Sequence, residues 1–241
     1  MYVFMGRGKK KRKAKQHKRL QRRIIIRQKM GKPVFFTLTH CAKKLQGLKN
    51  RYIYKANMHK LLFIGTRFYN VKYQSSIITN CNFRDTELIG VDFFNCNMHD
   101  ISFKNAKLNN VVFYNCNLKN ADFTGASFSH VSFICTNTKV AKGLSESDDG
   151  ILIYKTYKHI DLSSETESAL IGLSSNPSIY KANVLHVNKS KLNHWVLEII
   201  KERYGNEGLG FMAKKLIAKR NWDNMFTVFS YTLLLDKCFS K

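Results

Sequence analysis

Acidic residues are absent from the front of this chain of 241 residues. Residues 1–55 contain nineteen Lys and Arg but no Asp or Glu, whereas residues 56–241 contain 22 basic and 16 acidic residues. The first 55 residues therefore contribute +19 of the formal net charge of +25. A charge this large favours polyanionic partners, which are nucleic acid, the ribosome, an anionic membrane or an acidic protein.

A long apolar run is also absent. The longest apolar-rich stretch extends from Met225 to Leu235, far short of the roughly 20 residues that span a bilayer as a helix. The basic start is followed by only Ile24, Ile25 and Ile26, which are too few for the apolar core of a secretory signal. We expect a cytoplasmic protein that does not insert into a membrane.

Closely spaced cysteines are missing as well. None of the six cysteines forms a CxxC pair, and no cluster of histidines lies near them. In a chain of this size, such spacing argues against a disulfide framework and against a zinc site. The reducing cytoplasm is the matching compartment.

The sequence does contain a repeat of five residues. From Met58 to Phe133, sixteen positions spaced five apart are apolar or aromatic, and the position two residues before each is small or apolar. None of these thirty-two positions carries a charge. Asn or Gly recurs at the last position of many units, and both residues permit tight or left-handed backbone. A spacing of five fits neither an α-helix nor a single flat strand.

Two inward residues in every five, with a corner between units, predict a chain that winds around a square. Four sides make one coil of twenty residues, so side chains twenty apart should stack in ladders that fill the interior. The expected ladders are Val71, Val91, Val111 and Val131, then Phe63, Phe83, Phe103 and Phe123, then Tyr73, Phe93, Phe113 and Phe133. Cys96 and Cys116 also lie twenty apart, and we expect them to be small buried residues.

Units such as CNFRD, CNMHD, AKLNN, CNLKN and ADFTG resemble the A(D/N)LXX motif of the pentapeptide-repeat proteins. The resemblance extends from Ala56 to about Cys135, which is about a third of the chain. It implies a right-handed quadrilateral β-helix, in which the sixteen units make about four coils. Some members of this family resemble B-form DNA in shape and charge, and protect or inhibit DNA gyrase.

The predicted fold class is a β-solenoid with a basic N-terminal arm and a C-terminal α-helical module. The expected parts are an arm over residues 1–32, an N-terminal cap over 33–55, the β-helix over 56–138, a loop and strand connection over 139–189, and a helical module over 190–241. Within the cap, residues 39–48 favour a short helix that ends near Gly47.

Residues 190–241 show the helical period. Apolar residues from Leu192 to Tyr204 form one face, and Gly205 is a suitable C-terminal stop. Residues 207–220 and 221–238 favour two more helices. Because the end of a solenoid exposes unpaired backbone and apolar core, we expect this module to cap the rod or to form a homodimer. An amphipathic surface for anionic lipid is the alternative.

The basic arm is the strongest functional signal. Thirteen of the 24 residues from Gly6 to Lys29 are Lys or Arg, and none is acidic. Such a segment binds phosphates by releasing counterions, with weak sequence specificity and a steep dependence on salt. The residues that we expect to bind nucleic acid are Lys9, Lys10, Lys11, Arg12, Lys13, Lys15, Lys18, Arg19, Arg22, Arg23 and Arg27.

Two other interpretations of the arm stay open, contact with an anionic membrane surface and a solubilising tail. Only His17 could stack on a base, so base-specific reading is not expected. The sequence therefore does not choose between RNA, the ribosome and DNA.

No catalytic, cofactor or metal site is expected. Asp92 and Asp122 fall at outward positions on different coils and faces, so they do not form the carboxylate pair of acid–base catalysis. The glycines between Gly205 and Gly210 lack the preceding strand of a dinucleotide site. We predict a non-enzymatic scaffold that binds nucleic acid or a ribonucleoprotein through the arm and an unknown protein through the β-helix. The Lys- and Asn-rich composition favours a bacterial source.

The family resemblance also implies an alternative, a DNA mimic that modulates DNA gyrase or another topoisomerase, as in quinolone resistance. Mimicry needs an acidic rod, whereas residues 56–135 hold seven basic and five acidic residues. The +19 front would also repel the positively charged DNA-binding surface of a topoisomerase. The scaffold is therefore the preferred interpretation.

Overall fold

The computed structural model describes residue 22 and residues 37–39, 43–219 and 221–239. The chain divides into two units, residues 1–36 and residues 37–241, and the fold below is that of the second unit. Apart from Arg22, the predicted arm lies outside the described residues.

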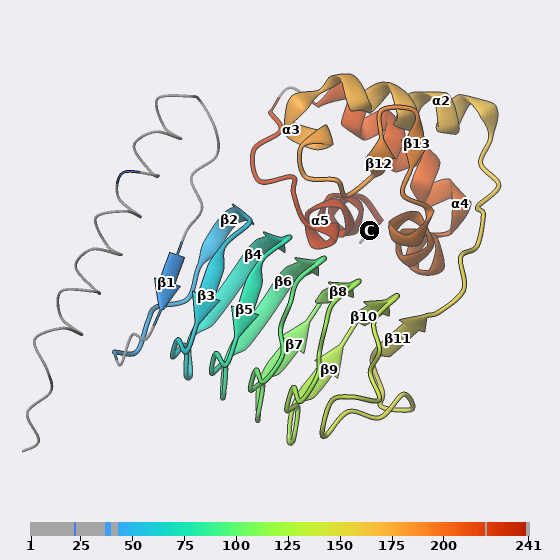
Figure 1. Ribbon diagram of the computed structural model, residues 1–241. Helices are drawn as coiled ribbons and strands as arrows, with labels where there is room; N and C mark the ends of the chain where they lie inside the picture. The colour runs from blue at the N-terminus through green and yellow to red at the C-terminus, as the bar shows by residue number, and fades with distance from the viewer. Residues whose placement is uncertain (1–21, 23–36, 40–42, 220, 240–241) are drawn as a thin grey trace, which may run out of the picture. The chain divides into compact units, whose positions relative to one another are not determined.

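A parallel β-solenoid forms the first part of this unit (Figure 1). Its strands are β1 (Thr37–Thr39), β2 (Lys49–Tyr54), β3 (Asn57–His59), β4 (Arg67–Gln74), β5 (Ile77–Thr79), β6 (Glu87–Phe94), β7 (Lys107–Asn109), β8 (Val112–Tyr114), β9 (Ser127–Ser129), β10 (Val131–Ile134) and β11 (Ile151–Tyr154). The largest sheet has the order β11-β10-β8-β6-β4-β2. Paired residues in neighbouring turns are twenty apart, as in Val71 with Val91, so the predicted coil length is confirmed.

The corners of the solenoid follow the repeat of five. Every fifth residue from Asn50 to Cys135 has a positive φ, and three of these residues are glycines. Asn is the commonest residue at the corners because its short polar side chain tolerates left-handed backbone. Four corners in each twenty residues give the four sides that the sequence predicted.

Stacked side chains fill the interior of the solenoid. The twelve residues expected in ladders are each at most 4% exposed. In one column the ring centroids are 4.8, 5.4 and 5.0 Å apart from Phe63 to Phe123. In the column that starts at Tyr73 the corresponding distances are 5.4, 5.2 and 4.9 Å. Offset and edge-to-face aromatic pairs add to the free energy gained by burial.

The solenoid has about five turns, where the sequence predicted about four. The additional pairing lies outside the repeats, because β2 pairs with β4 and β11 pairs with β10. Backbone pairing needs no particular side chain, so these strands extend the sheet without the repeat motif. The expected helix over 39–48 is wrong for its described residues, because Thr39 ends strand β1 and residues 43–48 are not helical. The N–H of Leu45 donates to the carbonyl of Leu62 in the next turn at 2.7 Å.

A helical module follows the solenoid. Its elements are α2 (Ser164–Gly172), the 3₁₀ helix η1 (Leu173–Ser175), α3 (Pro177–Tyr180), β12 (His186–Asn188), β13 (Lys191–Leu192), α4 (His194–Ala218) and α5 (Val228–Phe239). Gly205 has a φ of 67° and a ψ of −176°, so it interrupts α4 where the sequence predicted a stop. The sequence did not predict α2 and α3, which begin at the N-cap residues Ser163 and Asn176.

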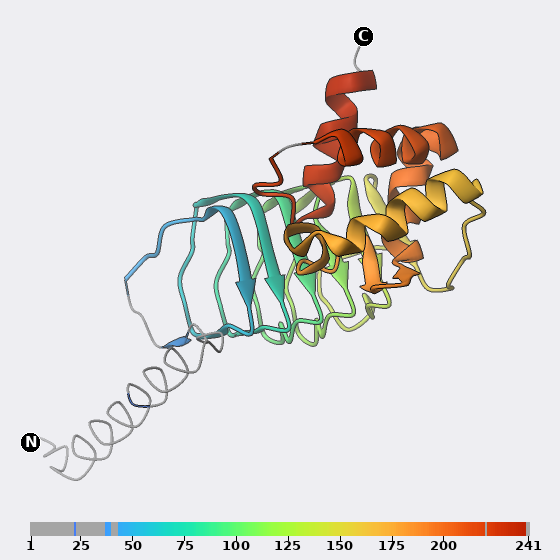
Figure 2. The same ribbon diagram turned by 90° about the horizontal axis from the view of Figure 1, so that it is seen from above.

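The helical module lies along one side of the solenoid (Figures 1 and 2). A second apolar core forms there between outward residues of the largest sheet and residues of the helices. The solenoid contributes Phe94, Val112, Ile134 and Tyr154, and the module contributes residues such as Leu170, Val196, Ile200, Met212 and Tyr231. The module therefore differs from the expected end cap, because its apolar face packs against a side and not against the open end of the ladders.

Candidate functional site on the covered side of the solenoid

The covered side of the solenoid is built from two outward rows of the largest sheet. The first row is Tyr52, Lys72, Asp92, Val112, Ser132 and Leu152, and the second is Tyr54, Gln74, Phe94, Tyr114, Ile134 and Tyr154. In the second row the rings of Phe94 and Tyr114 stack with centroids 4.9 Å apart. An outward row this apolar needs a cover, and the helical module supplies it.

The start of α5 is fixed to this side by hydrogen bonds. The hydroxyl of Thr227 donates to Oδ1 of Asn70 at 2.6 Å, and Nδ2 of Asn70 donates to the carbonyl of Asn224 at 3.1 Å. The N–H of Val228 donates to Oδ2 of Asp92 at 2.9 Å. A carboxylate at this position also interacts favourably with the positive end of the α5 dipole.

Lys72 and Asp92 form a buried ion pair beneath α5. The two residues are register partners in β4 and β6, and Nζ of Lys72 lies 3.8 Å from Oδ2 of Asp92. The same ammonium lies 3.4 Å from the ring centroid of Phe94, within the range of a cation–π interaction. Burial lowers the pKa of Lys72 and raises the pKa of Asp92, and the attraction between the two charges opposes both shifts.

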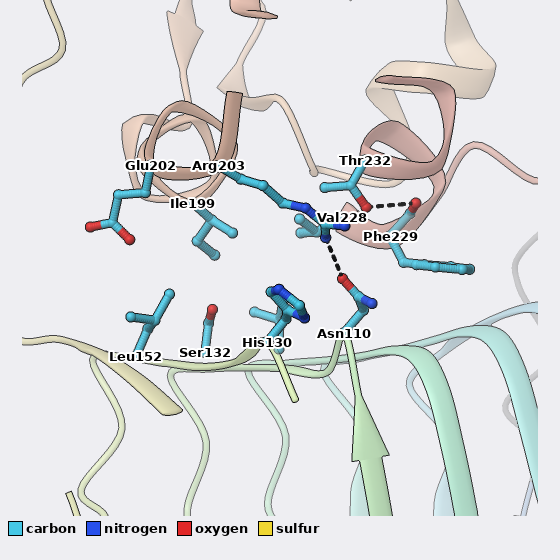
Figure 3. Close-up of a pocket in the computed structure, with 11 residues that line it drawn as sticks. Asn110, His130, Ser132, Leu152, Ile199, Glu202, Arg203, Val228, Phe229 and Thr232 are labelled. Atoms are coloured by element: carbon cyan, nitrogen blue, oxygen red, sulfur yellow. Dashed lines mark hydrogen bonds between the residues drawn. The ribbon is translucent and has the colours of Figure 1, made fainter. Parts of the chain in front are cut away.

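The contact between the solenoid and the helical module, which we call the joint, leaves a cleft of about 320 Å³. The cleft lies between the sheet and helices α4 and α5 (Figure 3). Apolar side chains form much of its wall, and polar side chains stand at its rim. The lining residues are Asn110, Val112, His130, Ser132, Leu152, Ile199, Glu202, Arg203, Val228, Phe229 and Thr232.

The charged residues of the cleft connect the module to the solenoid. Nη1 of Arg203 donates to Oδ1 of Asn110 at 3.0 Å (Figure 3). Nη2 of Arg203 also pairs with Asp236 of α5 at 3.2 Å. On the far side of the cleft, Glu202 accepts a hydrogen bond of 2.5 Å from the hydroxyl of Tyr154. These contacts hold α4 against two different turns, so the arrangement is that of a structural joint.

The residues predicted to bind nucleic acid are almost all outside the described residues. Of the eleven, only Arg22 is described, and it is exposed. The arm therefore stays a prediction. The ladder residues lie in the interior of the solenoid, where they are available to no partner.

The buried cysteines are packed against backbone. Cys96 and Cys116 are 2% and 7% exposed, and Sγ of Cys116 lies 3.1 Å from the carbonyl oxygen of Phe93. Burial raises the pKa of the Cys116 thiol well above its usual value. Within the described ranges, no group of His, Cys, Asp and Glu is arranged to hold a metal ion.

The sequence did not identify the joint itself. Asp92 was expected at an outward position, and it does point away from the solenoid interior, but α5 covers it completely. The available signal was the apolar character of one set of outward positions, Phe94, Val112, Tyr114 and Ile134. Nothing in the spacing signalled Arg203, because its partners Asn110 and Asp236 come from distant parts of the chain.

None of the helices in the described part of the chain is both long and apolar enough to cross a membrane. The longest of these described helices, α4, is interrupted at Gly205 and carries several charged residues.

Similar solved structures include two proteins that each match less than half of this chain. A pentapeptide repeat protein from the Arabidopsis thaliana thylakoid lumen shares 19% identity over 36% of this chain and 65% of its own, with a TM-score of 0.24. A trypsin-treated form of QnrB1, a plasmid-mediated fluoroquinolone resistance protein, shares 23% identity over 44% of this chain and 57% of its own, with a TM-score of 0.21. The chain thus spans less than two thirds of either protein. No curated protein matches the sequence.

The family comparison agrees with the geometry of the turns. A family model described as a pentapeptide repeat region matches residues 66–142, which form the solenoid turns with corners at every fifth residue. Residues 66–142 of this chain are a pentapeptide repeat region, and they form this part of the solenoid.

Proposed function

We propose that this protein is a non-enzymatic cytoplasmic scaffold that binds nucleic acid or a ribonucleoprotein through its basic arm. The observation that carries the proposal is the distribution of charge, because residues 1–55 hold nineteen basic residues and no acidic one. Neutralising phosphates with such a segment releases condensed counterions, which gives strong binding at low salt with little sequence preference.

The near-neutral repeats support a division of roles between the arm and the solenoid. Some charges of the solenoid are paired across turns, as in Arg67 with Glu87 at 3.0 Å and Lys104 with Asp122 at 3.2 Å. The helical module covers one side, so a protein partner would meet the other sides. Because stacked side chains fill its interior, the solenoid should change shape little on binding, and a rigid surface suits a scaffold.

The balanced charge of the repeats does not favour modulation of DNA gyrase by DNA mimicry. A mimic of DNA has to present a dense row of negative charge, whereas residues 56–135 hold seven basic and five acidic residues. Modulation of gyrase is therefore not proposed, and the test below includes it as a result that would contradict the proposal.

The proposal is tested by an electrophoretic mobility shift with RNA and with duplex DNA at low and high salt. The arm variant is the full chain with the eleven predicted arm residues changed to Gln. We expect the wild-type protein to bind both nucleic acids at low salt and to lose affinity steeply as salt rises, whereas the arm variant binds weakly. Equal binding by the two proteins would overturn the proposal. Inhibition of gyrase supercoiling without DNA binding, or binding confined to anionic liposomes, would also overturn it.

A further inference from the structure

The N-terminal end of the solenoid, formed by the first turn and the start of the second, carries six basic side chains. We call this set the basic end, and it consists of Lys43, Lys44, Lys49, Arg51, Lys55 and Lys60. All six residues are exposed. The first acidic residue of the sequence is Asp85, so the first turn itself contains no acidic residue.

Arg51 marks this end as one that faces water or an anion. It is the register partner of Val71 in the valine column, where the four valines are fully buried. Arg51 is exposed at the position where the repeat would place another valine. An apolar cap over this column would bury a guanidinium without an opposite charge, which is strongly unfavourable.

The opposite end of the solenoid has a different charge. Residues 136–155 hold three lysines and three acidic residues, and Nζ of Lys155 pairs with Glu146 at 2.7 Å. Each end finishes in a strand of the largest sheet, β2 at one end and β11 at the other, so the solenoid fold by itself does not require a cationic end. The surplus of positive charge belongs to the N-terminal end of the solenoid.

Neighbouring aromatic rings and the helical module shape the basic end. Nζ of Lys49 lies 5.8 Å from the ring centroid of Tyr69, and Nζ of Lys55 lies 5.1 Å from that of Tyr54. Such contacts restrict the lysine stems while leaving the ammonium groups hydrated. The module adds two lysines and one aspartate beside Tyr69, around a cavity of about 250 Å³, and these are Lys219, Lys237 and Asp223. The region stays basic.

We infer that the basic end is a second part of the nucleic-acid interface, where it contacts the phosphodiester backbone of a strand held by the arm. This inference rests on the proposed function of the arm. Chain connectivity alone keeps Lys32 within about 18 Å of Thr37, where β1 begins. Arg51 can present a bidentate fork to phosphate oxygens, and the lysines act as point charges.

The test measures binding of a fluorescent single-stranded RNA and of a duplex DNA by anisotropy over a range of salt concentrations. The basic-end variant is the full chain with Lys49→Gln, Arg51→Gln and Lys55→Gln. The matched control removes three exposed lysines from the later turns, with Lys119→Gln, Lys139→Gln and Lys142→Gln. We expect the basic-end variant to lose affinity by about tenfold or more and to lower the magnitude of the salt slope by about 2, while the control stays within about twofold of wild type.

Two comparisons separate this inference from the proposed function. If the basic-end variant binds like wild type while the arm variant does not, the inference fails and the proposed function stands. If the arm variant binds like wild type, the proposed function fails, and the inference that rests on it fails as well. A charge-retaining variant, Lys49→Arg with Lys55→Arg, should restore binding, and its failure to do so would assign the loss to folding and overturn the inference. Loss of binding to phosphatidylglycerol vesicles without loss of RNA or DNA binding would overturn it in favour of a membrane surface.

Discussion

Nζ of Lys72 lies 3.8 Å from Oδ2 of Asp92, and both side chains are fully buried between the solenoid and α5. Each residue stabilises the other, yet Nζ of Lys72 and Oδ1 of Asp92 have no hydrogen-bond partner within the described residues. Removing one member should therefore cost more than removing both. This pair places two opposite charges in the buried contact between the sheet and α5.

Substitution of this pair should be strongly non-additive. We expect a coupling free energy of about 1–3 kcal/mol between Lys72→Met and Asp92→Asn, because each single variant leaves the other charge buried without its opposite charge. The double variant should be more stable than either single variant, since the amide that replaces the carboxylate would keep an acceptor for the N–H of Val228. Urea unfolding of the four proteins measures this coupling. Additive losses would show that the pair contributes nothing as a pair.

The same pair predicts a stability minimum near neutral pH. Burial raises the folded-state pKa of Asp92 to about 6, so the stability that comes from its neutral form is complete below about 4 and is lost as pH rises through about 6. Burial lowers the folded-state pKa of Lys72 to about 8, so the stability that comes from its neutral form is complete above about 10.5 and is lost as pH falls through about 8.

Between these two values both groups are ionised in the folded protein, and both contributions are absent. The stability of wild type relative to the double variant Lys72→Met with Asp92→Asn should therefore rise on going from about pH 7 to about pH 5, and also from about pH 7 to about pH 9. Thermal unfolding of both proteins across this range provides the measurement. Parallel profiles would contradict the assignment, because the double variant removes only these two titrations.

Substitution of two corner glycines by alanine should distinguish the cost of backbone strain from the cost of a packing clash. Gly65 and Gly90 have φ values of 62° and 63°. Among the described residues, a Cβ on Gly65 would meet only Nζ of Lys44 at 3.7 Å, whereas a Cβ on Gly90 would collide with the ring of Phe229 in α5. Gly65→Ala should cost about 1–2 kcal/mol from its left-handed backbone, and Gly90→Ala should cost about 1–3 kcal/mol more.

Hydrogen exchange provides the second measurement for this glycine pair. In Gly90→Ala the amides of α5 should exchange faster than in Gly65→Ala, because α5 has to move away from the sheet. Similar exchange of α5 in both variants would contradict the close packing of Phe229 against Gly90.

The aromatic column should be sensitive to truncation at its middle. Phe113 lies between Phe93 and Phe133, with ring centroids 5.2 and 4.9 Å away. Phe113→Ala should lower the free energy of unfolding by about 3–5 kcal/mol, because it leaves a cavity between two stacked rings. The exposed control Lys119→Ala should change it by less than about 0.5 kcal/mol. A tolerated Phe113→Ala would show that the column is loosely packed.

Thiol reactivity should distinguish interior from corner cysteines. Burial raises the pKa of Cys81 to about 11 and raises the pKa of Cys116 as well, and both side chains are buried. Cys135 is exposed at a corner of the solenoid. Mass spectrometry after mild alkylation of the native protein should find Cys135 modified, and Cys81 and Cys116 modified only in denaturant. Rapid alkylation of the buried pair would place them outside the ladders.

The sequence predicted the solenoid because its interior repeats itself. Positions such as Val71 and Phe93 have the same surroundings in each turn, so the residue types recur and the period can be counted. The first turn could not be recognised in this way. Arg51 occupies a valine position there, and β2 is held by backbone pairing that requires no motif.

The joint could be predicted only in part. The helical period and Gly205 marked α4, but α2 and α3 start from single capping residues, Ser163 and Asn176, which are too common to identify a helix. Contacts such as that of Asp92 with Val228 depend on how two separately encoded layers meet. The prediction for the arm came from charge alone, and it remains to be tested by binding.

The helical module contacts successive turns of the solenoid and so fixes the spacing between them. Its anchors on the solenoid run from Asn70 and Asp92 to Asn110 and Tyr154. A duplicated coil of twenty residues between these anchors would displace the later ones by about 4.8 Å, beyond the reach of Arg203 and Glu202. A coil added before Asn50 would leave every anchor in place. The length of this rod can therefore change at its cationic end, while the span under the helices is fixed.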